Sequence, residues 1–165
     1  MTKPPITPPR IATPITEVLP QDDPGARGQH ERVKRKFFGS WRITEMEVWD
    51  QDATDLLGPA HIRFDAERLG DFRFIAIQGS MHCFFDERDH LPFVEFSWRG
   101  DDDGTETCGR GWAVIEKRLP RLPTGRPEDD VLRGRIFIHQ GDDSGFEATR
   151  SDGRKIARRE GRTRP

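Results

Sequence analysis

The amino-acid sequence predicts an all-β fold, an antiparallel eight-stranded up-and-down barrel with one short helix between its first two strands. Apolar side chains in the middle of the chain recur at every second position, which is typical of strands with one buried face. All 11 Phe and all 4 Trp of the 165 residues lie between Phe37 and Phe146, so only this part of the chain can build a core. The links between its apolar segments are short and rich in Gly, Asp and Ser, which favours antiparallel neighbours.

The alternation is clearest in two segments. Val94, Phe96 and Trp98 alternate with polar residues, and Ile136 and Ile138 follow the same spacing later in the chain. Eight short strands leave exposed edges unless the sheet closes, so we expect a barrel whose interior holds side chains or one small ligand, with an open sheet or a two-sheet sandwich as the alternatives. The eight predicted strands cover residues 38–49, 61–65, 72–78, 80–86, 93–99, 110–117, 133–140 and 145–150.

The segment between the first two strands predicts the helix. Asp52 can cap a first turn, Gly58 suits the left-handed exit of a helix, and Pro59 stops its continuation. Turns are expected at residues 78–80, 87–90, 101–104 and 141–144, and residues 118–130, which include three Pro, are expected to form one longer loop.

The two ends of the chain differ from its middle in composition. Seven of the 13 Pro precede Gly25, and repeated X-Pro pairs exclude helix. We therefore expect residues 1–36 to be a disordered arm, Pro-rich and then basic, residues 37–150 to be the β-barrel domain, and residues 151–165 to be a basic flexible tail. The barrel segment contains 14 basic and 23 acidic residues, so an acidic body carries two basic ends.

Composition also bears on location and redox state. No stretch reaches the ~18 consecutive apolar residues that span a bilayer, and the first ten residues lack the apolar segment of a signal peptide. We expect a cytoplasmic protein without membrane contact. Cys83 and Cys108 are the only cysteines, and we expect them to be reduced, partly buried thiols.

Two positions near the ends of the barrel segment carry a family resemblance. Gly39-Ser40-Trp41 forms the GxW motif that opens the first strand of calycins, the lipocalin-like and avidin-like barrels, and Arg150 ends the predicted last strand. The chain therefore resembles a calycin-like small β-barrel, which implies that Arg150 lies across Trp41 in a cation–π contact at the barrel floor. The pattern of residues 41–60, 109–116 and 134–146 also resembles small bacterial proteins of unassigned function, and this likeness implies no activity.

Arginines beside aromatic residues predict a binding site for a small apolar or anionic ligand inside the barrel. Arg110 and Trp112 share one strand face, Arg135 and His139 share another, and a guanidinium group can hold an anionic group in two hydrogen bonds. The alternative is that both faces form the wet outside of a half-buried sheet. The predicted ligand-binding residues are Glu45, Arg110, Trp112, Arg135 and His139.

The place of Glu45 depends on the geometry of the first strand. Without a bulge, Glu45 and Glu47 share the apolar face, where two neighbouring carboxylates raise one another's pKa. A bulge near Thr44 would instead turn Met46 and Val48 inward and both glutamates outward.

Other patterns have a simpler interpretation than a catalytic or metal site. His139, Asp142 and Ser144 fall in one predicted hairpin tip, where their composition is ordinary for a turn. The histidines are scattered over separate segments, so we expect no metal, no cofactor and no catalytic residue. Residues 117–123 fit the basic-x-x-Pro-x-x-Pro form that SH3-like grooves recognise, but such a short motif often arises by chance and we expect a stiff loop instead.

The sequence leaves functions of different classes open. The first is a non-enzymatic barrel that binds a small ligand in its interior. The alternative is a protein- or nucleic-acid-interaction module that uses the proline-rich segments and a basic rim of residues 32–36 and 154–159, since the first and last strands of such a barrel meet at one rim. The third is an enzyme with acid–base chemistry on Glu45 and His139. A filled interior favours the interaction module, and an interior cavity favours ligand binding.

Overall fold

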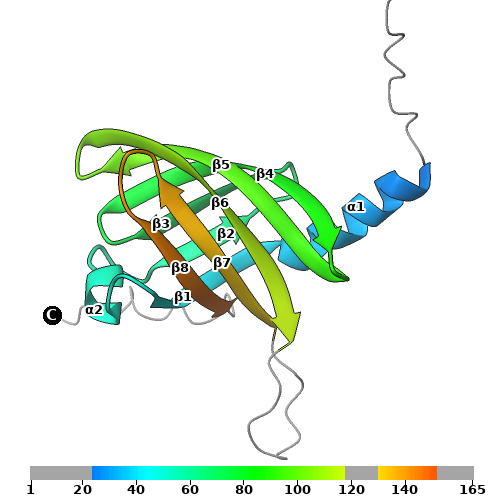
Figure 1. Ribbon diagram of the computed structural model, residues 1–165, viewed down its shortest axis with the longest axis horizontal. Helices are drawn as coiled ribbons and strands as arrows, with labels where there is room; N and C mark the ends of the chain where they lie inside the picture. Colours follow the sequence, from blue (N-terminus) through cyan, green and yellow to red (C-terminus); the bar gives the residue numbers. More distant parts are fainter. Residues whose placement is uncertain (1–23, 118–129, 152–165) are drawn as a thin grey trace, which may run out of the picture.

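A computed structural model describes residues 24–117 and 130–151, which form a closed β-barrel with two helices (Figure 1). All neighbouring strands pair antiparallel in chain order, and β1 pairs with β8, so the predicted eight-stranded up-and-down barrel is confirmed. The predictions for residues 1–23, 118–129 and 152–165 lie outside the described residues. The elements are α1 (Pro24–Phe37), β1 (Gly39–Met46), α2 (Gln51–Thr54), β2 (His61–Phe64), β3 (Leu69–Phe74), β4 (Ile77–Arg88), β5 (Leu91–Asp102), β6 (Thr105–Lys117), β7 (Asp130–Ile138) and β8 (Asp143–Arg150).

Aromatic rings fill the barrel interior by lying over glycines on the neighbouring strand. Phe96 pairs across strands with Gly111, where a Cβ would lie 2.4 Å from the ring. Phe146 pairs with Gly134, where a Cβ would lie 2.7 Å from the ring. Each ring thus occupies the space that a side chain on its partner strand would need. The largest fully buried side chains include Trp41, Phe37, Phe64, Phe72, Phe74, Ile43, Ile62 and Met81.

The hairpin of β3 and β4 differs from the prediction in its turn. β3 ends at Phe74 and β4 begins at Ile77, and Ile75 in the turn has a φ of 52°. Gly79, predicted to lie in a turn, lies within β4 opposite Phe72, so that prediction is wrong. The glycine is needed for packing rather than for a turn, because a Cβ there would lie 2.6 Å from the Phe72 ring.

β1 contains a bulge that changes which of its side chains face the barrel interior. The register of β1 against β8 shifts between Ile43 and Glu45, after which Met46 is buried and Glu45 and Glu47 are exposed. The bulge alternative is therefore confirmed for these residues. Val48, which it placed inside, is 51% exposed, because the strand ends at Met46.

Residues 24–37 are helical, where the sequence analysis predicts the basic part of a disordered arm. α1 lies at one end of the barrel and α2 at the opposite end (Figure 1). α1 buries Val33 and Phe37, and the Phe37 ring lies 5.5 Å from that of Phe64 and 5.4 Å from that of Phe85. Burial of one short apolar stripe against the barrel stabilises this helix, and such a stripe is a weak signal in a basic sequence.

The loop around α2 is fastened to the barrel by hydrogen bonds. The helix cap is Asp50 rather than Asp52, since the Asp50 carboxylate accepts a hydrogen bond of 2.8 Å from the backbone N–H of Ala53. Asp55 accepts hydrogen bonds from the Ala60 backbone N–H and from the Arg42 side chain. Partial burial raises the pKa of Asp55, but these hydrogen bonds and one from Gln51 outweigh it and lower the pKa.

Trp41 and Arg150 form the contact at the barrel floor that the calycin resemblance implies, and both also bind the end of α1, which it does not imply. The Arg150 guanidinium lies 4.3 Å from the centroid of the Trp41 ring, which confirms the cation–π contact. The Trp41 indole N–H donates a 2.9 Å hydrogen bond to the carbonyl of Phe37, and Arg150 donates to the carbonyls of Lys36 and Phe38. These carbonyls lie at the C-terminal end of α1, where a cation is favourable.

Replacing Arg150 by Met should lower the free energy of unfolding by about 2 kcal/mol, because the cation–π contact and the hydrogen bonds to the end of α1 are lost. Denaturant unfolding followed by circular dichroism measures this change. Arg99→Met is the matched control, since the Arg99 side chain is 80% exposed and its only ion pair in the described residues, with Glu106, is at the surface. Equal stability of the two variants would contradict the proposed role of Arg150.

Replacing Gly111 by Ala should destabilise the barrel by about 1–3 kcal/mol, because the added methyl group meets the Phe96 ring and the backbone oxygen of Arg135. Gly28→Ala in α1 is the control, since nothing lies within 4 Å of a Cβ there and alanine favours the helix by about 1 kcal/mol. Thermal melting of both variants checks the opposite signs, and a Gly111→Ala variant as stable as the parent would argue against the tight ring-over-glycine packing.

Candidate functional site

The five predicted ligand-binding residues lie outside the barrel, so their assignment to the interior is wrong. In β6 the buried residues are Gly111, Ala113 and Ile115, which leaves Arg110 and Trp112 on the outer face. In β7, Arg135 likewise alternates with buried neighbours. Glu45 faces outward after the bulge, and His139 is exposed beyond the end of β7.

The physical reason for this error is the size of the side chains on the two faces of β6. The larger and more aromatic face of a strand is normally the buried one. Here the inner face carries Gly109, Gly111 and Ala113, and the rings of Trp98 and Phe96 on β5 fill the space above the two glycines. Trp112 is thereby left 37% exposed on the outside.

The strand register brings residues from distant segments into rows across the outer face of β4 to β7. Phe84 pairs with Glu95 and Glu95 pairs with Trp112, so these three residues form one row across β4, β5 and β6. A neighbouring row contains His82, Ser97, Arg110 and Phe137 in the same way.

These rows form a shallow hollow on the outer face, which we call the outer groove. Its volume is about 210 Å³, and its exposed aromatic rings belong to Phe84, which is 52% exposed, and Trp112. Phe84 and Trp112 lie two strands apart with Glu95 between them, so the hollow presents two separate exposed rings. The outer groove is lined by the side chains of Phe84, Glu95, Ser97, Arg110, Trp112 and Phe137.

The charged groups of the outer groove differ in their partners. The Arg110 guanidinium lies 4.8 Å from the centroid of the Phe137 ring and forms no ion pair within residues 24–117 and 130–151. Glu95 lies 3.1 Å from a guanidinium nitrogen of Arg88, and both of these side chains are more than half exposed. Such a surface ion pair contributes about 0–1 kcal/mol, so Glu95 can exchange its partner at low cost.

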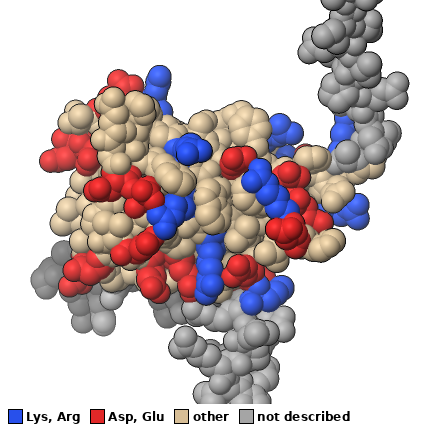
Figure 2. Space-filling view, in the orientation of Figure 1, with Lys and Arg blue, Asp and Glu red and all other residues tan. Residues whose placement is uncertain are grey.

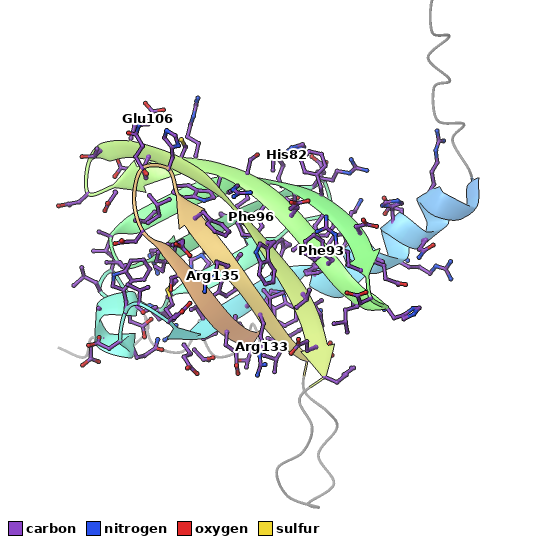
Figure 3. All side chains as sticks on the ribbon, in the orientation of Figure 1. His82, Phe93, Phe96, Glu106, Arg133 and Arg135 are labelled. Atoms are coloured by element: carbon purple, nitrogen blue, oxygen red, sulfur yellow. The ribbon has the colours of Figure 1, made fainter. Side chains whose placement is uncertain are left out.

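A second hollow of about 240 Å³ adjoins the outer groove on the side of α1. It includes His30 and Lys34 of α1 and shares Phe84 and Glu95 with the outer groove. The two hollows thus lie side by side on the outer face, and Phe84 and Glu95 line both of them. Phe93, which lines the second hollow, lies toward the α1 end of the barrel in Figure 3. Arg135 lies over β7 and lines neither hollow.

Arg135 already has two ion-pair partners near the end of β1. It forms ion pairs with Asp143 of β8 and with Glu47 beyond β1. The hydrogen bond that Arg135 donates to the Asp143 carboxylate, together with the negative charge of Glu47, raises the pKa of Arg135 above its usual value. Both carboxylates thus hold this side chain, and we leave it out of the candidate groove.

A polar cluster on β2 and β3 was missed by the sequence analysis. Asp71 lies 3.2 Å from His61 Nε2 and accepts a 2.6 Å hydrogen bond from Arg63. The cluster borders a hollow of about 370 Å³ that also includes Arg73 and Arg99. These residues meet only because β2 pairs with β3. From the sequence one could see that they alternate with apolar residues and so share the outer face, but not that they lie together.

The structure brings together neither a catalytic triad nor a metal site in the part of the chain that it describes. The Ser144 hydroxyl is buried and hydrogen-bonded to the backbone of Val48 and Gly145, whereas His139 is exposed. The interpretation of this tip as a turn agrees with the hydrogen bond from Ile138 to Asp142. Among the described residues, no group of three His, Cys, Asp or Glu side chains could hold a metal ion.

Comparison with known proteins yields no match: no family model, no curated protein and no solved structure matches this chain. The calycin resemblance therefore rests on the GxW motif and the Trp41–Arg150 contact. Of the helices in the described part of the chain, none is long and apolar enough to cross a membrane.

The two thiols should differ sharply in reactivity. Burial, with a smaller contribution from the charge of Asp65, raises the pKa of Cys83 to about 12, so that only about one molecule in 10⁴ carries the thiolate at pH 8. Cys108 is exposed. Iodoacetamide at pH 8 should therefore modify Cys108 alone in the folded protein and both cysteines in guanidinium, as mass spectrometry can count. Modification of native Cys83 at the rate of Cys108 would contradict this prediction.

Proposed function

We propose that this chain is a binding module that recognises an extended peptide segment of a protein partner in its outer groove. The proposal is carried by one observation: Arg110, without an ion pair in the described residues, lies over the ring of Phe137 and lines the same hollow as the exposed rings of Trp112 and Phe84. Aromatic residues and arginine dominate the binding energy of protein interfaces. The partner segment would place apolar or proline side chains against the rings and a carboxylate against Arg110.

The filled interior supports an outer site over an interior one. A bound small molecule needs a cavity of a few hundred Å³, whereas here rings lie in contact with the backbone of the glycines that face them. Successive side chains of a strand point to opposite faces of the sheet. The large polar side chains therefore lie outside the barrel, where a macromolecular partner can reach them.

Charge favours a protein partner over a nucleic acid. Binding to nucleic acid relies on a basic surface that neutralises several phosphates. The face over β5 to β8 instead carries Lys and Arg side chains interspersed with Asp and Glu (Figure 2). The outer groove itself contains one arginine and one glutamate, so a phosphate backbone would meet Glu95 as well as Arg110.

Selection from a displayed library of random 12-residue peptides on the immobilised full chain tests this function. Selected peptides should carry Asp or Glu next to apolar or proline residues, and their affinity should fall about tenfold or more on Trp112→Ala and on Arg110→Ala, which corresponds to 1.4 kcal/mol or more. Fluorescence anisotropy of the labelled peptides measures the dissociation constants.

Arg99→Ala is the control, because Arg99 lies on the outer face away from the outer groove. Peptides that bind the parent, Trp112→Ala and Arg110→Ala equally well, or a library from which no peptide is selected, would overturn the proposed function.

A further inference from the structure

The hollow of about 370 Å³ on the outer face of β2 to β5 contains an arginine without a partner. The side chain of Arg73 forms no ion pair and no hydrogen bond within residues 24–117 and 130–151, and its Nε atom is buried. Its guanidinium group packs beside Gly58, where a Cβ would lie 3.3 Å from Nη2. Burying part of a charge without an opposite charge nearby is unfavourable. Arg73 thus lacks a counter-charge in the part of the chain that the structure describes.

The strand register places a second arginine and two neutral hydrogen-bonding side chains at the same hollow. Arg73 of β3 pairs with Gln78 of β4, and Ser80 of β4 pairs with Arg99 of β5. The Gln78 and Ser80 side chains are exposed and form no hydrogen bond with other described residues. We call this hollow, which is lined by Arg73, Gln78, Ser80 and Arg99, the arginine hollow.

The two carboxylates that also line the arginine hollow already have partners. Asp71 accepts a 2.6 Å hydrogen bond from Arg63 and lies 3.2 Å from Nε2 of His61. Asp101 accepts a 2.8 Å hydrogen bond from the backbone N–H of Gly104, in the turn between β5 and β6. Neither carboxylate forms an ion pair with Arg73 or Arg99.

Arg99 can exchange its partner for a ligand. Its ion pair with Glu106 has a distance of 3.5 Å, and the two side chains are 80% and 77% exposed, so this pair is weak. A guanidinium group binds oxyanions through two parallel hydrogen bonds, and two such groups match a dianion. Phe72 also lines the hollow but is only 2% exposed, so a ligand would meet little apolar surface there.

We propose that the arginine hollow binds the phosphate monoester group of a small phosphorylated molecule. A monoester carries a charge of about −1.5 to −2 at pH 7 and has three acceptor oxygens. Arg73 and Arg99 balance this charge, and Gln78 and Ser80 donate hydrogen bonds to the remaining oxygens. The phosphate supplies the counter-charge that Arg73 lacks. The site shares no lining residue with the outer groove, so it does not depend on the proposed function.

Titration of the isotope-labelled full chain with inorganic phosphate, followed by amide NMR, tests this site. The resonances of Gly79 and Gly100, whose backbone lines the arginine hollow, should shift along a curve that saturates at millimolar phosphate. Sodium chloride at the same ionic strength is the control and should give no saturating shift. Equal effects of the two salts would overturn the inference.

Charge removal identifies the arginines that hold the ligand. Arg73→Gln and Arg99→Gln should each weaken phosphate binding about tenfold, because each removes one charged donor. Arg133→Gln is the control with the same change in charge, since Arg133 lies on β7 and does not line the hollow (Figure 3). Unchanged affinity in Arg99→Gln would overturn the inference. This variant decides by itself if Arg73→Gln fails to fold, because the Arg99 side chain is 80% exposed.

Two further probes identify the class of phosphate compound. Glycerol phosphate, a small monoester, should bind at least as tightly as inorganic phosphate. Dimethyl phosphate, a diester with a single negative charge, should bind much more weakly, and equal binding of the two esters would overturn the assignment to a monoester. An oligothymidylate of about 12 nucleotides should also bind weakly, and tighter binding of this probe than of glycerol phosphate would overturn the small molecule in favour of nucleic acid.

Discussion

The pairing of β1 with β8 joins the ends of the meander, and the rest of the structure depends on this closure. It gives every strand two neighbours, so that the sheet has no edge strand. It also brings the end of the last strand beside the start of the first, which places Arg150 over Trp41. Through this arginine the closed barrel holds the C-terminal carbonyls of α1, and Phe37 covers the barrel end.

Closure with eight strands leaves a narrow interior, and the sequence fills it with rings opposite glycines. This arrangement determines the outer surface as well. When Gly111 and Ala113 face inward under neighbouring rings, Arg110 and Trp112 must face outward, because successive residues of a strand alternate. The outer groove is thus a consequence of interior packing.

Parts of the candidate groove were visible in the sequence. Arg110 and Trp112 were identified as neighbours on one face, and the adjacent Phe84 and Phe85 indicate that one aromatic ring of β4 faces outward. The other walls were not visible. Glu95 and Phe137 reach the groove through the registers of β5 with β6 and of β6 with β7, which depend on pairings between separate strands. The helix α1 was missed for a similar reason, since only the barrel end provides a partner for Val33 and Phe37.

The sequence by itself predicted an all-β fold of eight antiparallel strands, and the calycin resemblance implied the contact at the barrel floor. Alternation of apolar residues, short polar turns and the GxW motif are local signals, whereas closure, for which an open sheet and a sandwich were the alternatives, depends on the pairing of β1 with β8. The tertiary structure decided which face of each strand is buried, where the bulge of β1 lies and which residues meet outside the barrel. The choice of buried face depends on the limited interior volume. Where a ring of one strand fills this volume, only a glycine fits opposite it on the paired strand, and the residues next to that glycine must then face outward.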